Sequence, residues 1–137
     1  MQNPKEQNKP TKPDVNANKI SEIIEKGNTE RLNDIAKQLG KYYAFGRKER
    51  EKLSSAQIRN ILDRIQRMKK FDKDQIQLLR PLLAYAAGKD RTTDEKLKHL
   101  QGILDPAITM VNDEKKFNNF KNFFEAIVAY HRYYGGD

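Results

Sequence analysis

Apolar residues recur every three or four positions along most of this chain, and this spacing constrains the fold more than any other feature. The clearest stripe occupies one segment: Ile58, Ile61, Leu62, Ile65 and Met68. Such spacing is typical of a helix that buries one face. No segment alternates apolar and polar residues as a half-buried strand would. The sequence therefore predicts an all-α fold, a small bundle of about five to six helices.

Capping residues and glycines divide this pattern into successive helices. Ser, Thr and Asp side chains accept hydrogen bonds from the first N–H groups of a helix, and glycine favours its end. The expected helices are residues 19–26, residues 30–39, one begun by Ser54 or Ser55 and ending near residue 70, one begun by Asp72 or Asp74 and ended by Gly88, one that follows a capping box from Thr92 to Glu95, and residues 114–134, capped by Asp113.

We expect one helical domain, residues 19–137, preceded by a disordered tail, residues 1–18. The tail holds three prolines and almost no apolar side chains, so it cannot bury enough surface to offset the entropy of ordering. The remaining length suits a single domain. Within it, Gly40 is expected to end a helix, so that residues 41–52 form a loop.

Two prolines are expected to interrupt the second half of the bundle. Pro81 lacks an N–H and clashes with the preceding turn, so it should kink or split its helix. That helix is apolar nearly all round, which predicts near-total burial between its neighbours. Asp105-Pro106 is expected to end the next helix and to leave residues 107–111 as a separate short piece.

Positive charge is concentrated in residues 41–70. This segment holds ten basic and three acidic side chains, whereas the whole chain holds 27 and 19, a net charge of +8. Each Lys or Arg that neutralises a phosphate releases a condensed counterion, so clustered positive charge raises affinity for a polyanion. Nucleic acid is therefore the first partner that the sequence favours.

The basic side chains of the helix expected near residues 55–70 lie opposite its apolar stripe. At 100° per residue, Arg59 and Arg67 point outward, with Arg64 at the flank. A helix N-terminus also presents free N–H groups and the positive end of its dipole. We therefore predict a phosphate site where this helix begins. Its members are two hydroxyls and two cations: Ser54, Ser55, Lys52 and Arg59.

Tyr42, Tyr43 and Phe45 leave two interpretations open. Interleaved with cations, they could stack on bases while the neighbouring cations hold phosphates. Alternatively, the rings tuck beneath the loop of residues 41–52 and only its charges face solvent.

No reaction chemistry is indicated. Cysteine is absent, which excludes disulfides and thiolate sites. No HExxH, P-loop, GxSxG or EF-hand pattern occurs, and the two histidines, His99 and His131, have no motif partners. His131 lies on the aromatic stripe of the last helix and is interpreted as a packed, hydrogen-bonded residue. We predict that the chain is not an enzyme and uses no cofactor or metal ion.

No apolar run approaches the roughly 20 residues that span a bilayer, and the N-terminus lacks the apolar core of a signal peptide. The absence of cysteine also suits a reducing compartment. We therefore expect a soluble, cytoplasmic protein without a membrane partner.

Three elements, in order, resemble one known family. Residues 53–60 (LSSAQIRN) are similar to its leucine–hydroxyl–hydroxyl–serine–lysine–leucine–arginine–asparagine element, and residues 85–90 (YAAGKD) resemble its tyrosine–x–alanine–glycine–arginine–glutamate corner. Residues 124–130 (FEAIVAY), followed by residues 132–136 (RYYGG), resemble its C-terminal signature. The family is the small subunit of type III-A CRISPR interference (Csm) complexes.

The resemblance implies a helical subunit without catalytic activity, whose copies line up beside the Csm backbone subunits. Its implied partners are crRNA and target RNA, the Csm backbone and large subunits, and neighbouring copies of itself. Arg59, Lys89 and Arg132 match basic positions of the family, whereas Gln57 stands where the family typically shows lysine. Lys89 replaces an arginine, so it keeps the charge but not the bidentate fork.

Charge and resemblance together predict RNA binding through the backbone, independent of sequence. The expected RNA-binding residues are Arg47, Lys48, Arg50, Lys52, Ser54, Ser55, Arg59, Arg64, Arg67, Lys89, Arg91 and Arg132. Two other functions stay open. One is a protein–protein scaffold whose basic face meets an acidic partner, and the other is a dimeric DNA-binding regulator with a recognition helix.

Overall fold

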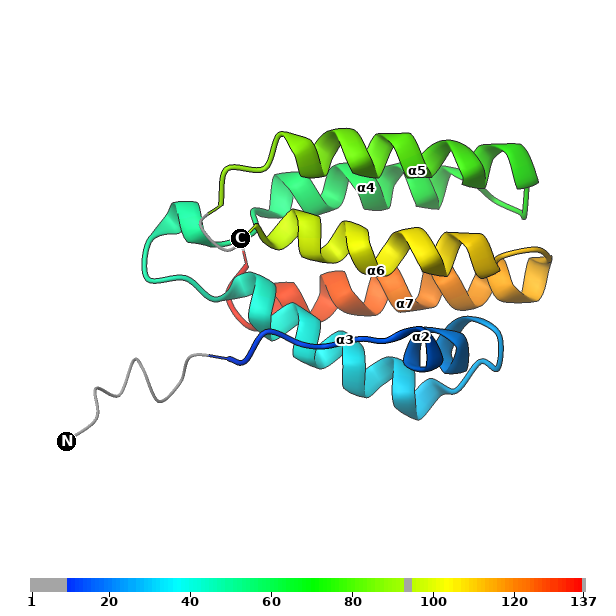
Figure 1. Cartoon of the computed structure of the whole chain (residues 1–137), viewed down its shortest axis with the longest axis horizontal. Coiled ribbons are helices and arrows are strands. Elements are labelled where there is room, and N and C mark those ends of the chain that lie inside the picture. Colours follow the sequence, from blue (N-terminus) through cyan, green and yellow to red (C-terminus); the bar gives the residue numbers. More distant parts are fainter. Residues whose placement is uncertain (1–9, 93–94, 137) are drawn as a thin grey trace.

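The computed structural model describes residues 10–92 and 95–136, which form a bundle of α-helices (Figure 1). Its elements are α2 (Ala17–Ile24), α3 (Thr29–Ala44), the 3-10 helix η1 (Glu49–Glu51), α4 (Ser55–Arg67), α5 (Lys73–Gly88), α6 (Lys96–Met110) and α7 (Glu114–Tyr133). These residues contain no strand and six α-helices, so the all-α prediction is confirmed. Residues 1–9 of the expected tail, residues 93–94 and residue 137 lie outside the described part.

Polar side chains begin most of the helices. Each accepts a hydrogen bond from a first-turn N–H, which satisfies a donor that has no partner inside the helix. The capping residues are Asn16, Asn28, Ser54, Asp72 and Asp113. The predicted caps at Ser54, Asp72 and Asp113 are thus confirmed. The expected start of α6 at Thr92 is wrong, because the helix begins at Lys96 after Glu95 adopts a left-handed backbone (φ 49°).

Close packing of α3 on α7 is the most extensive interhelical contact among the described residues. Gly27, just before α3, lies beside Asn119, and Gly40 lies beside Tyr130 and His131, so the two helices run in the same direction. A Cβ added at Gly40 would come within 2.6 Å of the His131 backbone nitrogen. Gly40 therefore allows two helix backbones to approach. The expectation that it ends a helix is wrong, and α3 continues to Ala44.

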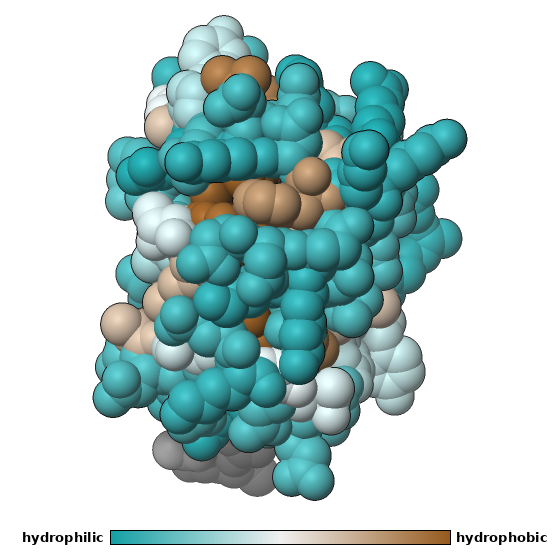
Figure 2. Space-filling view, turned by 90° about the vertical axis from the view of Figure 1, so that its right-hand side faces the viewer, coloured by the Kyte–Doolittle hydropathy of each residue, from teal (hydrophilic) through white to brown (hydrophobic). Residues whose placement is uncertain are grey.

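The remaining helices flank this pair. In Figure 1, α4 and α5 lie on one side of α6 and α7, and α2 and α3 lie on the other. The packed interior includes a run of buried aromatic side chains from α7: Phe117, Phe120, Phe123 and Phe124. The end of the bundle shown in Figure 2 is mostly hydrophilic, with a small recessed apolar area, as expected for a chain that is 34% charged.

Both internal prolines lie inside continuous helices, so the predicted split at Pro81 and the separate piece after Pro106 are wrong. Pro81 is exposed, and the carbonyl four residues earlier that it leaves unpaired belongs to an exposed stretch of α5. The two helices also brace each other, because Arg80 Nε lies 2.8 Å from Asp105 Oδ1 across their interface. Packing over their length outweighs the local penalty at each proline.

Helix α5 is less buried than its composition predicts. Leu78 is 62% exposed and Tyr85 is 68% exposed. Its opposite face, with Ile76, Leu79 and Leu83, is buried. The prediction of near-total burial is therefore wrong, and α5 leaves apolar and aromatic surface open.

The segment before α2 packs onto α6. Pro13 is buried, and its carbonyl oxygen lies 2.8 Å from His99 Nε2. The His99 Nδ1 lies 2.8 Å from the hydroxyl of buried Tyr43. Because a carbonyl only accepts, His99 donates through Nε2, and in the neutral imidazole Nδ1 then accepts the Tyr43 hydroxyl. Residues 13–18 thus differ from the expected tail, since they include this contact and the first turn of α2.

We expect Gly40→Ala to lower the free energy of unfolding by about 1–3 kcal/mol, because the new methyl group would force α3 away from α7. Urea unfolding followed by circular dichroism measures this change. Gly102→Ala is the matched control, since nothing lies within 4 Å of a Cβ added there in α6. The control should be neutral or gain up to about 1 kcal/mol. Equal losses in both variants would contradict the close-approach explanation.

Acidification should destabilise the fold through His99. Burial, the largest cause, lowers the pKa of His99 below its ordinary value of 6.5. The unfolded chain therefore binds the proton more readily, so His99 contributes fully above about pH 6.5 and its contribution falls as pH drops towards the lower folded pKa. Urea unfolding between pH 7.5 and 5 should show a shallower loss for His99→Gln than for wild type. A slope that the substitution leaves unchanged would contradict this role.

Candidate nucleic-acid interface

A buried lysine holds the basic loop against the bundle. Lys96, in the first turn of α6, has no exposed surface, and its ammonium group donates hydrogen bonds to the carbonyls of Phe45 and Glu51. The same group lies 5.5 Å from the centre of the Tyr42 ring. Burial of a charge is costly unless such partners surround it. Lys96 therefore fixes both ends of the loop that carries Lys48 and Arg50, and the sequence analysis missed this residue.

The start of α4 is anchored to both α3 and α7. The Leu53 N–H donates to the Tyr43 carbonyl over 2.9 Å. The Leu53 carbonyl lies 2.7 Å from His131 Nε2, and Gly136 packs against the His131 ring. His131 is 1% exposed, so its interpretation as a packed, hydrogen-bonded residue is confirmed. Backbone contacts thus set the position of the first turn of α4.

The aromatic residues before the loop belong mainly to the core. Tyr42 is 6% exposed and Tyr43 is fully buried, while Phe45 is half-buried. Burial raises the pKa of Tyr43 well above its ordinary value, so the hydroxyl stays protonated and donates to His99. Of the two interpretations, the tucked one is confirmed for Tyr42 and Tyr43, and base stacking on these two rings is excluded.

A capping box begins α4. The Ser54 hydroxyl accepts the Gln57 N–H over 3.2 Å, and Gln57 Oε1 accepts the Ser54 N–H over 3.0 Å. Gln57 replaces the lysine typical of the resembled element, and its side chain is engaged in this cap. The Ser54 hydroxyl is likewise engaged in the cap, so the backbone N–H groups of Ser55 and Ala56 are the donors left at this helix start.

Exposed cations lie near this helix start and along the outer face of α4. Those whose side chains have no hydrogen bond or ion pair to any described residue are Lys48, Arg50, Arg59, Arg64, Arg67 and Arg132. The predicted outward orientation of the α4 arginines is confirmed, since Ile58, Ile61 and Ile65 are buried on the opposite face. The whole set therefore presents positive charge to solvent.

The other predicted cations have contacts within the chain. Lys52 lies 3.1 Å from Glu49 Oε1, and Lys89 sits 5.2 Å from the centre of the Tyr85 ring. Arg91 donates to the carbonyls of Gly88 and Asp90. The Arg47 N–H donates to the Glu51 carboxylate, which is the largest cause of a lowered pKa at Glu51. Such solvent-facing contacts are weak, so a phosphate can compete for these cations.

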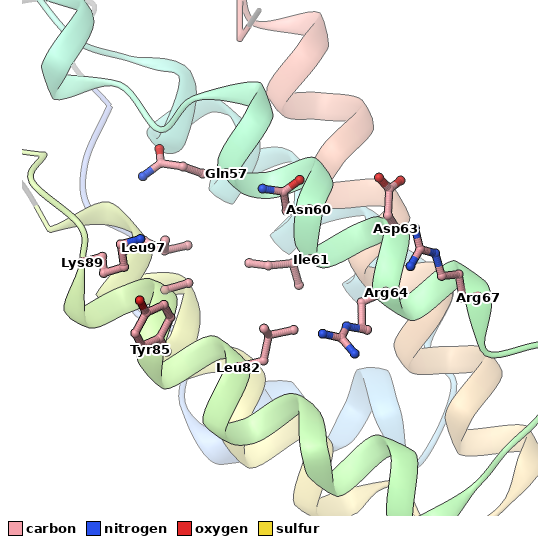
Figure 3. Close-up of a pocket in the computed structure, with 11 residues that line it drawn as sticks. Gln57, Asn60, Ile61, Asp63, Arg64, Arg67, Leu82, Tyr85, Lys89 and Leu97 are labelled. Carbon is pink, nitrogen blue, oxygen red and sulfur yellow. The ribbon is translucent and has the colours of Figure 1, made fainter.

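Most of the predicted site lies at one end of the bundle. The loop of residues 45–54, the start of α4, the end of α5 and the end of α7 meet there, near the C-terminus in Figure 1. Arg64 and Arg67 lie farther along α4 (Figure 3). The structure therefore brings nine of the predicted cations and hydroxyls to one end of the bundle, and Arg59 lies one turn into α4. The nine are Arg47, Lys48, Arg50, Lys52, Ser54, Ser55, Lys89, Arg91 and Arg132.

A groove of about 670 Å³ runs between α4 and α5 from this end. Figure 3 shows Ile61 and Leu82 facing each other across it, with Arg64 reaching between the helices. Tyr85 and Lys89 line the α5 side. No local sequence pattern indicates this groove, because it depends on how far apart α4 and α5 lie.

The comparison that decides the family covers most of the chain. A protein-family model described as Csm2 Type III-A matches residues 26–137, which include α3 to α7. The chain belongs to the Csm2 family. It is thus a small subunit of the type III-A CRISPR-Cas (Csm) complex, as the resemblance implied. No curated protein and no solved structure matches the chain significantly.

Two other kinds of site are not found in the described residues of this Csm2 protein. Among residues 10–92 and 95–136, no helix is both long enough and apolar enough to cross a bilayer. Within the same ranges, no three His, Asp or Glu side chains are grouped so that they could hold a metal ion. The basic end and its adjoining groove are therefore the features that a functional proposal has to explain.

Removing the buried ammonium should release the basic loop. We expect Lys96→Met to leave the Phe45 and Glu51 carbonyls without their donor and to lower the free energy of unfolding by roughly 2 kcal/mol. Amide hydrogen exchange in residues 46–52 should accelerate. Lys98→Met is the control, because Lys98 is exposed and its ion pair is with exposed Glu95. Unchanged exchange in the Lys96 variant would contradict the clamp.

Proposed function

We propose that this Csm2 protein is a non-catalytic RNA-binding subunit, and that its basic end and the outer face of α4 contact the backbones of crRNA and target RNA. The observation that carries this proposal is the set of exposed cations on α4 whose side chains have no partner among the described residues: Arg59, Arg64 and Arg67. Arginines gathered on a surface that contacts only water would contribute little to stability. When each arginine neutralises a phosphate, a condensed counterion is released from the RNA, and this release favours binding.

The fixed backbone beneath the exposed cations supports the same function. Lys96, His131 and the capping box hold the loop and the start of α4 in place, so the cations above them extend from a rigid support. A ligand then loses less free energy to ordering of the protein when it binds. The two N–H groups left at the start of α4 add a place for one phosphate oxygen.

Sequence-independent contact follows from the chemistry of these groups. Arg and Lys on an outer helix face reach phosphates and sugars, which are the same for every sequence. A complex programmed by its guide needs such contacts, because base pairing between guide and target carries the specificity. The proposal therefore places recognition of sequence in the RNA and places this chain along the RNA backbone.

The absence of catalysis is part of the proposal. Both histidines serve the fold, since His99 bridges Pro13 and Tyr43 and His131 holds Leu53. Several acids are also engaged, as Asp72 and Asp113 are in helix caps and Asp105 is with Arg80. These groups are committed to structure rather than to an exposed acid–base pair.

Charge reversal at the basic end should weaken RNA binding without unfolding the chain. We expect Lys52→Glu combined with Arg59→Glu to lower the affinity of the assembled complex for target RNA by about tenfold or more at moderate salt, because two phosphate contacts become repulsive. The control is Lys37→Glu with Lys115→Glu, which makes the same charge change at exposed sites on α3 and α7. Filter binding at two salt concentrations measures the affinity, and circular dichroism verifies the fold.

Unchanged retention of target RNA by the Lys52/Arg59 pair would overturn the site. Equal losses in the pair and in its control would show only a general dependence on net charge. The rival function, a scaffold that binds an acidic protein, would give crosslinks from this face to protein and none to RNA.

A further inference from the structure

The groove between α4 and α5 is an open space between two helices that pack on different neighbours. Helix α4 packs against α7, and α5 packs against α6. The floor of the groove is apolar and comes from three elements, through Ile61, Leu82 and Leu97. The groove has a volume of about 670 Å³ and leaves part of Leu82 and most of the Tyr85 ring open to water, so a ligand that covers them would gain free energy.

One wall of this groove is aromatic and unusually open. Tyr85 is 68% exposed on α5, next to the groove, and the Lys89 ammonium lies 5.2 Å from its ring centre. Nothing in the core requires this ring, since the buried face of α5 is formed by Ile76, Leu79 and Leu83. An exposed aromatic face beside a cation is the arrangement on which nucleobases stack while their phosphates are neutralised.

The opposite wall carries amides and arginines. Asn60 is exposed on α4, and no described residue hydrogen-bonds its side chain. An amide offers one acceptor and two donors, which match the polar edge of a base. Arg64 reaches between the helices and Arg67 lies one turn farther, so three cations outweigh the one acid of the lining, Asp63.

We infer that this groove takes one unpaired nucleotide of the RNA that runs along α4, with its base against Tyr85 and its phosphate near Arg64 or Lys89. This inference rests on the proposed function and deepens it, because it adds a base-holding site to contacts made with the backbone alone. A paired base is held in its stack, whereas an unpaired one can turn out of the strand and reach the floor of the groove. The site is sequence-tolerant, since every base has a face to stack.

An acidic peptide is the other ligand that the charges would suit. It would use the cations and the apolar floor, but it would have no need of an exposed ring or of a free amide on the facing wall. The combination of Tyr85, Asn60 and flanking cations therefore favours a nucleotide.

The test compares three labelled RNA duplexes with the same paired sequence. One is fully paired, one carries a single bulged nucleotide, and one carries an abasic bulge that keeps the extra phosphate. Fluorescence anisotropy with the full chain measures the affinity for each. We expect the bulged duplex to bind about tenfold more tightly than the other two, because one stacked base adds to the backbone contacts.

Variants identify the groove as the source of that difference. Tyr85→Leu should remove the tenfold preference, and Tyr85→Phe should keep it, since phenylalanine retains the stacking face. Tyr133→Leu is the matched control, because Tyr133 is 78% exposed on α7 and lies outside the groove. It should keep the preference. The Lys52→Glu/Arg59→Glu pair should weaken all three duplexes equally, because it acts on backbone contacts.

Each other outcome overturns the inference. Equal affinity of wild type for the three duplexes, combined with a loss in the Lys52/Arg59 pair, would remove the nucleotide site and leave the proposed function intact. No binding to any duplex, even at the highest protein concentration, would remove both. A Tyr85→Leu variant that keeps the preference but recovers fewer Csm subunits on co-purification would assign the groove to a protein segment instead.

Discussion

The structure depends first on the close approach of α3 and α7. These helices are far apart in the sequence and run in the same direction, so their contact decides where every helix between them must lie. Gly40 makes the approach possible, because any side chain at that position would meet the backbone of α7. His131 lies on the turn of α7 that Gly40 contacts, and its ring is hydrogen-bonded to the Leu53 carbonyl. The α3–α7 contact therefore also sets the position of the start of α4. One backbone contact in the core thus orients the helix that carries the outward arginines.

The basic end combines one buried charge with many exposed ones. The Lys96 ammonium group donates hydrogen bonds to the loop carbonyls of Phe45 and Glu51, and these bonds keep the loop folded onto the bundle. The cations of the loop itself then face outward. A buried lysine therefore holds in place the loop that carries the exposed cations. Its hydrogen bonds explain how so many positive side chains can gather there without the loop separating from the bundle.

Features set by neighbours in the sequence could be predicted, and features set by distant contacts could not. The caps at Ser54 and Asp113 follow from side chains that reach N–H groups two or three residues away, so a local pattern identified them. Gly40 was expected to end a helix because nothing near it in the sequence indicates its real partner, the His131 backbone, which is about 90 residues away. Lys96 resembled any surface lysine for the same reason. The exposed ring of Tyr85 also had no local sign, since the groove beside it arises from the spacing of two helices.

The parallel arrangement of α3 and α7 has a consequence for synthesis. The apolar face of α3 finds its main partner only when the last helix of the bundle has left the ribosome. Until then Ile35, Leu39 and Tyr43 have to be shielded by transient contacts, because α4 to α6 do not form an extensive contact with α3. A contact that closes so long a loop also makes folding slower than in a bundle of sequential neighbours. Chains interrupted before α7 would therefore expose this face, and we expect them to aggregate or to be degraded.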